Sequence, residues 1–254
     1  SGGMMNANPV RLVVFDVDGV LTDGEAAPLD LDLLRLLADL NRRARDAASG
    51  GAVPGATLCT GRPQPYVEAL LQAADCLLPA IFEGGAGYFM PAARRAFPHP
   101  DMKDFAAVRK ARELLAGEAR RSGRIFLQPG KEYTISVFPA APEYMAVLRD
   151  ITAETVGELA SRLESAFSAS CLNIHAKGSN KGAGIELLAE LTGVPPENML
   201  GVGDSEVDLP FLEKVGFAAA PANATPEVRK LCGYVSPFPT SRGVRDILAH
   251  FGII

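Results

Sequence analysis

The apolar residues in the first third of the chain alternate between short unbroken runs and segments with helical spacing. Residues 11–15, Arg-Leu-Val-Val-Phe, are mostly β-branched or aromatic, which is typical of a strand buried in a parallel sheet. Residues 31–45 carry leucines at helical spacing with Asp and Arg between them, so they predict an amphipathic helix. Two more short strands, at 56–60 and 79–82, flank a helix predicted from residue 63 to about 74. This order predicts a parallel α/β sheet.

The segment from 84 to 176 follows a different pattern. A glycine-rich stretch at 83–87 precedes a charged helix at 102–121, a hairpin of strands at 124–128 and 133–138, a broken helical region at 142–167 and a strand at 170–176. Strands that pair with near neighbours, with helices gathered beside them, predict a small α+β domain. We place this domain as an insertion, because the alternation of strands and helices resumes after it.

The last third of the chain returns to the α/β pattern. Ser179 is expected to cap a helix at 181–192, which ends at Gly193. The later elements are strands at 198–202, 217–220 and 234–235 and helices at 209–214, 226–231 and 242–251. The predicted fold is therefore α/β, with a Rossmann-like parallel-sheet core formed by residues 9–83 and 177–254 and a smaller inserted α+β domain at 84–176.

Two aspartates, Asp16 and Asp18, directly follow the first strand. Ligands of open parallel sheets bind beyond the carboxyl ends of the strands, so the chain itself places both carboxylates at such an edge. One carboxylate could attack a phosphorus atom, while the other could carry the proton of the leaving oxygen. Oxygen ligands of this kind also suit Mg²⁺. Taken alone, the pair is equally compatible with an ordinary acidic turn.

Three further polar signals lie at strand ends or helix starts. Thr60-Gly61 offers a hydroxyl and a backbone N–H to a phosphoryl oxygen. Lys181 opens a helix, where a second positive charge is unfavourable unless an anion is bound. Asp204 follows a strand, and Asp208 comes one helical turn later on the same face. Each signal alone is also compatible with a simple turn, a solvated lysine or a capping acid.

In this order, the residues resemble the four motifs of the haloacid dehalogenase superfamily of phosphatases. The motifs are Asp16-x-Asp18-Gly19, Thr60-Gly61, Lys181 and Gly203-Asp204-Ser205-x-x-Asp208. A domain inserted between the second and third motifs resembles the branch with an α/β cap of type IIB. The stretch 83–86 resembles the Glu-Asn-Gly-Ala opening of that cap, with Gly84 in place of asparagine, and residues 221–225 resemble a segment of phosphoglycolate and sugar-phosphate phosphatases.

The resemblance implies a role for each residue. Asp16 would be the nucleophile that forms an aspartyl-phosphate, and Asp18 would be the acid that protonates the leaving alcohol and then the base that activates water. Thr60, Gly61 and Lys181 would hold the phosphoryl oxygens. The Mg²⁺ site would comprise Asp16, the backbone carbonyl of Asp18, Asp204 and the supporting Asp208. Residues of the cap would select the leaving group, with Lys131, Glu132, Tyr133 and His175 as candidates.

The charges of this site predict dependence on a metal. Four ionised aspartates carry a charge of about −4, whereas Mg²⁺ and Lys181 return +3, and a phosphate dianion must still enter. We therefore expect little turnover without a divalent ion. We also expect Asp18 to hold a proton in the resting site.

The charge and cysteine content of the chain limit the classes of binding partner and the cellular location that we expect. The net charge is −5, and no block of lysine or arginine stands out, so neither a nucleic acid nor a membrane is expected as a partner. The four cysteines are scattered without metal-binding spacing, which is typical of reduced thiols and predicts a cytoplasmic protein. The predicted function is Mg²⁺-dependent hydrolysis of a small phosphorylated metabolite, such as phosphoglycolate, a phosphoglycerate derivative or a sugar phosphate. Two alternatives remain open, a phosphosugar mutase and a non-catalytic protein that binds a phosphorylated ligand.

Overall fold

A five-stranded parallel sheet forms the centre of the larger part of the molecule in the computed structural model, which describes residues 10–47, 53–168 and 170–254. Its strand order is β12-β11-β10-β1-β2. The strands are β1 (Leu12–Phe15), β2 (Gly55–Leu58), β10 (Met199–Val202), β11 (Phe217–Ala220) and β12 (Tyr234–Val235). β1 lies between β10 and β2, with Phe15 opposite Val202 and Leu58, so these three strands end at the same edge.

Helices cover both faces of this sheet, and the residues of β1 show why its sequence is continuously apolar. Val13 and Phe15 belong to one buried cluster, whereas Leu12 and Val14 belong to another on the opposite face. The first cluster is closed by α1 (Leu31–Asp46), α2 (Gln64–Ala73) and α8 (Thr240–His250), and the second by α5 (Lys181–Thr192), α6 (Leu209–Leu212) and α7 (Pro226–Leu231). The predicted parallel-sheet core is therefore confirmed.

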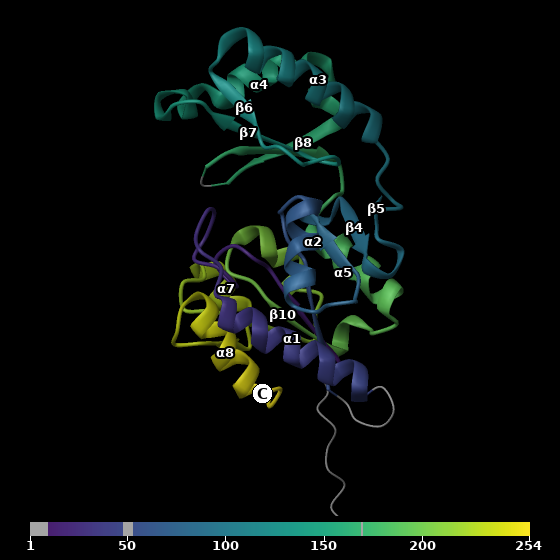
Figure 1. The fold of residues 1–254 in the computed structure, drawn as a ribbon. Helices are drawn as coiled ribbons and strands as arrows, with labels where there is room; N and C mark the ends of the chain where they lie inside the picture. Colours follow the sequence, from purple (N-terminus) through teal and green to yellow (C-terminus); the bar gives the residue numbers. More distant parts are fainter. Residues whose placement is uncertain (1–9, 48–52, 169) are drawn as a thin grey trace, which may run out of the picture.

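A smaller unit with its own hydrophobic cluster lies above the core in Figure 1. Its antiparallel sheet has the order β6-β7-β9-β8, with strands β6 (Ile125–Leu127), β7 (Ile135–Pro139), β8 (Leu163–Phe167) and β9 (Leu172–Ala176). The helices α3 (Phe105–Ser122) and α4 (Leu148–Val156) cover the face of this sheet that points away from the core. Leu172, Ile174 and Ala176 pack under them, so Asn173 and His175 lie on the opposite face, toward the core.

The sequence analysis missed two strands in the segment 87–98. β3 (Ala80–Phe82) pairs antiparallel with β4 (Gly87–Met90), and β4 pairs with β5 (Arg95–Pro98), which gives a separate three-stranded sheet. Phe89 of β4 packs in the same cluster as Phe15 of the core. The glycine-rich stretch before β4 hid this hairpin, because it looked like a flexible connection. The predicted limits of the inserted domain, 84 and 176, stay a prediction.

Two local predictions were wrong. The region 142–167 was expected to be helical with breaks, but only Leu148–Val156 is α-helical, and Leu163–Phe167 is the strand β8, paired along its whole length with β9. Pairing with a neighbouring strand thus overrides a composition that suits a helix. The cap of α5 is Asn180, whose side chain accepts a hydrogen bond from the N–H of Ala183, and not Ser179.

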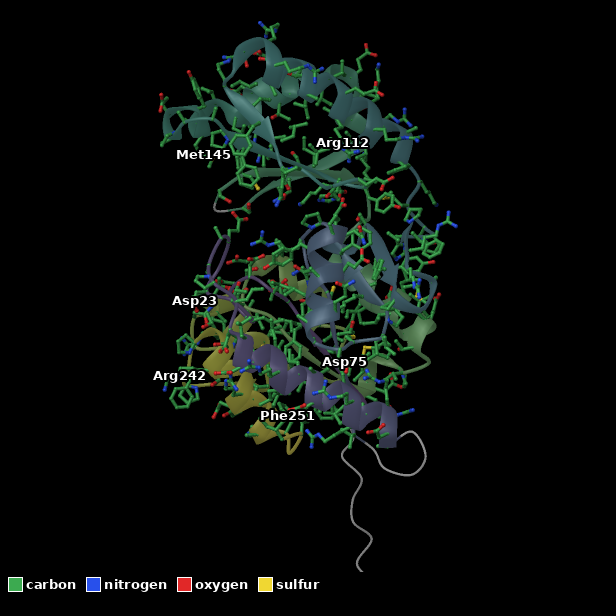
Figure 2. The ribbon with its side chains drawn as sticks, viewed as in Figure 1. Asp23, Asp75, Arg112, Met145, Arg242 and Phe251 are labelled. Carbon is green, nitrogen blue, oxygen red and sulfur yellow. The ribbon has the colours of Figure 1, made fainter. Side chains whose placement is uncertain are left out.

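A buried carboxylate joins the smaller unit to the core. Glu83, just after β3, accepts hydrogen bonds from the backbone N–H groups of residues 132, 133 and 134 at 2.6–2.9 Å, and from the hydroxyl of Thr134. Arg112 on α3, which is labelled in the smaller unit in Figure 2, donates to the carbonyls of Glu132 and Thr134. The loop between β6 and β7 is therefore held at a fixed position over the core. No helix in the three described segments combines the length and apolarity that a membrane crossing requires.

Candidate metal and phosphoryl site

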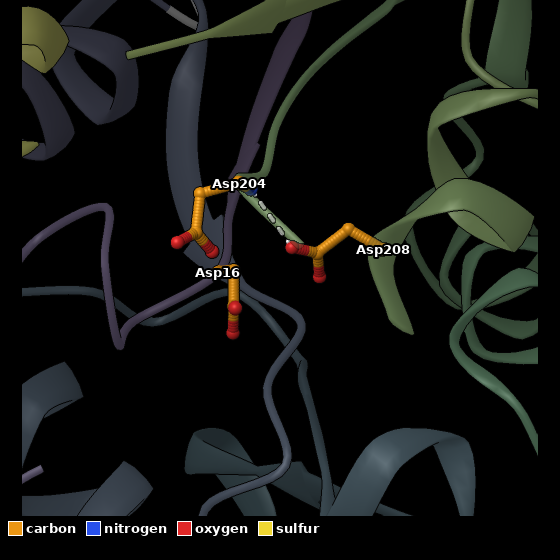
Figure 3. Close-up of side chains that lie close together, drawn as sticks. All are labelled: Asp16, Asp204 and Asp208. Atoms are coloured by element: carbon orange, nitrogen blue, oxygen red, sulfur yellow. Dashed lines mark hydrogen bonds between the residues drawn. The ribbon is translucent and has the colours of Figure 1, made fainter. Parts of the chain in front are cut away.

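Three carboxylates meet where β1 and β10 end. Asp16 follows β1, and its N–H donates to the carbonyl of Val202 on β10. Asp204 follows β10, and Asp208 follows one turn later. One oxygen from each of these side chains lies within 4.8 Å of the other two. Figure 3 shows the three side chains close together. The sequence therefore predicted correctly that residues far apart in the chain converge at this edge of the sheet.

Two glycines make room for this convergence. Gly19 has φ +77, and a Cβ at this position would lie 2.0 Å from a carboxylate oxygen of Asp204. A Cβ at Gly203 would lie 2.6 Å from the Cβ of Asp208. Any other residue at either position would push one of the aspartates away from the cluster.

Asp208 organises the loop around the site. It is fully buried, and one oxygen accepts the backbone N–H groups of Asp204 and Ser205, at 2.9 and 3.1 Å. The other oxygen accepts the ammonium of Lys181 at 2.5 Å. Asp208 therefore fixes both the position of Asp204 and that of the lysine.

Lys181, the first residue of α5, lies between two of the carboxylates. Its ammonium is 2.9 Å from Asp16 and 2.5 Å from Asp208, and only 4% of the side chain's surface is exposed. Burial disfavours the charged ammonium, but Asp16 and Asp208 outweigh this effect, so the pKa of Lys181 is raised. The lysine is thus held as a cation beside the predicted nucleophile.

The cluster carries more negative charge than Lys181 neutralises. Burial raises the pKa of Asp204 to about 7, and the charges of Asp16 and Asp208 add to the shift. Burial, together with Asp208, also raises the pKa of Asp16 against the opposing effect of Lys181. A divalent cation would favour the ionised form of both groups, and three hard oxygen donors at this separation suit Mg²⁺. The residues present therefore fit the predicted metal.

The structure places Asp18 apart from this cluster. Both its oxygens accept hydrogen bonds from the guanidinium of Arg62, at 2.6 and 2.7 Å, and Arg62 also stacks over the ring of Tyr66. Such a two-point contact suits an ionised carboxylate. Our expectation of a protonated Asp18 counted four aspartates, Mg²⁺ and Lys181 but left out Arg62. The proton on Asp18 in the resting site stays a prediction.

Thr60 and Gly61 lie beside Arg62. Thr60 is buried, its N–H donates to the carbonyl of Ile81, and its hydroxyl oxygen accepts the N–H of Arg62 at 3.2 Å. Gly61 is exposed, and no atom lies within 4 Å of the position that its Cβ would take. The sequence showed Arg62 directly after these two residues, but a single arginine carried no signal without its partner.

Asn223 is a second residue whose contacts the sequence did not reveal. Its amide nitrogen donates to the carbonyl of Gly19 at 2.9 Å, and the Oδ2 of Asp204 lies 3.4 Å away. Its amide oxygen accepts the N–H of Thr240. Asn223 thus joins the loops after β1, β10 and β11, and the only sequence signal was its place in the 221–225 segment.

The predicted substrate contacts in the smaller unit, which is called the cap from here on, lie in different environments. The ring of Tyr133 is buried against Phe82 and Phe105, so it packs between the cap and the core and does not reach the acidic cluster. Glu132 is exposed and contributes its N–H to Glu83. His175 lies on the open face of the cap sheet, 3.9 Å from Glu164. Lys131 is half-buried at the junction of cap and core, next to Gly130, which lies against Pro63 and Pro65.

Comparisons with known proteins agree with this geometry. A family model described as haloacid dehalogenase-like hydrolase matches residues 130–248. The phosphoglycolate phosphatase of Methanopyrus kandleri is 28% identical over 249 residues, which cover 93% of this chain and 95% of that protein. The phosphoglycolate phosphatase of Methanothermobacter thermautotrophicus is 36% identical over 109 residues, covering 42% of this chain and 49% of the relative. The solved structure of a subclass IIB sugar phosphatase superposes with a TM-score of 0.67 at 17% identity, over 96% of this chain and all of that one, which concerns the fold.

Proposed function

We propose, for a chain that belongs to the haloacid dehalogenase-like hydrolases, that it is a Mg²⁺-dependent phosphomonoesterase that uses Asp16 as its nucleophile. The family and the enzyme class predicted from the sequence, a phosphatase, are confirmed by the family model and the named relatives. The metal, the intermediate, the residue roles and the substrate belong to the proposal. The observation that supports it best is the carboxylate of Asp16, which is 2.9 Å from Lys181 and shares its environment with Asp204 and Asp208.

The first step is the attack of Asp16 on phosphorus. An oxygen of Asp16 forms a bond to the phosphorus while the ester oxygen of the leaving group departs, which gives an aspartyl-phosphate. The ammonium of Lys181, the hydroxyl of Thr60 and the N–H of Gly61 hold the phosphoryl oxygens. Asp16 and Asp204 would hold Mg²⁺, which would neutralise the charge that develops on the phosphoryl group.

Proton transfer is assigned to Asp18. In the resting site Asp18 is paired with Arg62, so the pair has to open before Asp18 can carry a proton. The phosphoryl oxygens of an incoming substrate offer Arg62 an alternative anion. The released carboxylate of Asp18 takes up a proton from solvent and passes it to the leaving oxygen, and in the second step it removes a proton from the water that hydrolyses the aspartyl-phosphate.

The substrate is proposed to be a small phosphorylated metabolite, with phosphoglycolate as the first candidate. The support is the match to the phosphoglycolate phosphatase of Methanopyrus kandleri, which spans nearly the whole of both chains. We also propose a cytoplasmic location. The cysteines Cys59, Cys76, Cys171 and Cys232 are all free thiols, as is usual in a reducing compartment.

Release of inorganic phosphate tests the proposed function. The purified protein is stripped of metal by exhaustive chelation, and phosphate release from 2-phosphoglycolate and p-nitrophenyl phosphate is measured before and after Mg²⁺ is restored. We expect chelation to lower both rates by at least ~100-fold and Mg²⁺ to restore them, because the charge of the site and of the phosphoryl group then lacks neutralisation. Chelator presaturated with Mg²⁺ is the control. A full rate in the stripped protein would contradict the proposal.

A further inference from the structure

We propose that Lys131 binds a carboxylate on the leaving group, so that this enzyme selects phosphorylated carboxylic acids over neutral phosphate esters. This inference rests on the proposed function and deepens it, because it assigns one cap residue to one chemical group of the substrate.

Lys131 is a half-buried cation without a counter-ion. Its ammonium donates one hydrogen bond, to the hydroxyl of Ser136 at 2.7 Å. Among the residues that the structure describes, no carboxylate lies within 4.0 Å of it. Burial lowers the pKa of Lys131, and the more distant Glu83 and Glu25 offset this only in part. A charge withdrawn from water is normally paired, so the ammonium of Lys131 is suited to bind an anionic group.

Glu83 does not supply that anion. Its oxygens already accept three backbone N–H groups and the hydroxyl of Thr134. These bonds hold the residues that directly follow Lys131 in the chain, and Arg112 holds the carbonyls of Glu132 and Thr134. A rigid loop therefore fixes the position of Lys131, although its ammonium has one hydrogen-bond partner there, the hydroxyl of Ser136.

The same loop brings Lys131 to the reaction site. A Cβ on Gly130 would lie 3.7 Å from Pro63 and 3.9 Å from Pro65, at the start of α2, so the loop lies directly on the segment that follows Thr60 and Gly61. Arg62, whose guanidinium holds Asp18, is one of the charges that act on Lys131. Lys131 thus lies against the segment that follows Thr60 and Gly61, within electrostatic range of the arginine that holds Asp18.

Neighbouring polar groups complete the subsite. Ser136 accepts from Lys131 and donates to the amide oxygen of Asn173 at 2.5 Å. Ser136 and Asn173 are paired across β7 and β9, on the open face of the cap sheet. No described residue accepts a hydrogen bond from the amide nitrogen of Asn173, so this group can donate to a second oxygen of the same ligand.

A carboxylate fits this subsite better than a hydroxyl group. An ammonium and an amide N–H₂ both donate, and an ionised carboxylate offers two oxygens that only accept. A sugar hydroxyl would satisfy a hydrogen bond but leave the charge of Lys131 unpaired. Arg62 acts on Lys131 and also holds Asp18, the proposed proton donor to the ester oxygen, so the subsite suits a carboxylate close to that oxygen, as in a phosphorylated 2-hydroxy acid.

A pair of matched substrates tests the inference. 2-Phosphoglycolate carries the carboxylate, whereas 2-hydroxyethyl phosphate carries a neutral hydroxymethyl group in its place. We expect Lys131→Met to lower kcat/KM for 2-phosphoglycolate by roughly 10- to 100-fold, mainly through KM, because a hydrogen bond to a charged group is lost. The loss for 2-hydroxyethyl phosphate should be at least tenfold smaller. Lys131→Arg should retain most of the preference for the acid, because it keeps the charge.

Lys110→Met is the control variant, since it removes the same charge from the exposed side of α3, where Lys110 pairs with Glu113. Its kcat/KM should match that of the unchanged protein for both substrates. An equal loss on both substrates in Lys131→Met would overturn the carboxylate subsite and indicate that Lys131 only supports the loop. Absence of hydrolysis of either substrate by the unchanged protein would instead overturn the proposed function.

Discussion

The acidic cluster at the carboxyl ends of β1 and β10 and the junction around Lys131 differ in how their buried charges are paired. In the cluster, the carboxylate of Asp208 accepts hydrogen bonds from the ammonium of Lys181 and from two backbone N–H groups. The ammonium of Lys181 also contacts Asp16. At the junction, a half-buried ammonium has one hydroxyl as its partner. The first arrangement fixes the groups to which the proposed function assigns the chemistry. The second leaves one charge for the carboxylate that we propose binds there, so on this proposal the core supplies the chemistry and the cap supplies the choice of substrate.

The largest effect is expected from the cluster. Asp16→Asn keeps the shape of the side chain but cannot attack phosphorus, so turnover should fall by at least about 10⁴-fold. This loss should be the same for every phosphate ester, in contrast to the substrate-dependent loss in Lys131→Met. Phosphate release measures it, and circular dichroism verifies the fold. Asp32→Asn, which changes an exposed aspartate on α1, is the matched control. Unchanged turnover in Asp16→Asn would contradict the proposal that Asp16 is the nucleophile.

Stability should separate the two regions next. Asp208→Ala leaves Lys181 and two backbone N–H groups without their acceptor, so the free energy of unfolding should fall by about 3 kcal/mol. Lys131→Met removes an unpaired charge and should leave the protein within about 1 kcal/mol of the original or more stable. Urea unfolding measures both. Glu186→Ala, which breaks an exposed pair with Lys214, should cost less than about 1 kcal/mol. If Lys131→Met were as destabilising as Asp208→Ala, both charges would stabilise the fold, which would contradict the contrast between the two regions.

A smaller effect should appear in the pH dependence of the metal-free protein. Asp204 has its pKa raised from 3.8 to about 7, so in the folded state it keeps a proton that the unfolded chain has already released. The folded state therefore loses stability as the pH rises from about 4 toward 7, by about 1 kcal/mol or more. Mg²⁺ requires the ionised form, so it should raise Tm more at pH 8 than at pH 5. Thermal unfolding with and without Mg²⁺ at both pH values measures this, and an equal rise would contradict the account.

The sequence predicted the core well because its chemistry and its periodicity agree. Residues such as Asp16 and Asp204 each end a continuously apolar strand, and parallel strands can only bring such ends together at one edge. The prediction was poorer where pairing depends on the partner. β8 has a sequence that also suits a helix, and only its registry with β9 makes it a strand.

The electrostatic partners could not be predicted for a similar reason. Arg62 and Asp18 are 44 residues apart, and neither residue indicates the other until the fold brings them together. Glu83 was visible as the first residue of a glycine-rich stretch, but its partners are backbone N–H groups, which every sequence contains. The packing of the Tyr133 ring against Phe82 and Phe105 likewise depends on contacts between the cap and the core, which the sequence of the loop before β7 does not reveal.

The attachment of the β6–β7 loop through its peptide groups has an evolutionary consequence. Glu83 holds the loop mainly by N–H groups of the main chain, which do not change when side chains are replaced. Position 131 can therefore mutate without detaching the loop from the body of the enzyme. A protein built in this way can acquire a new substrate preference by one replacement at a site whose geometry is inherited unchanged.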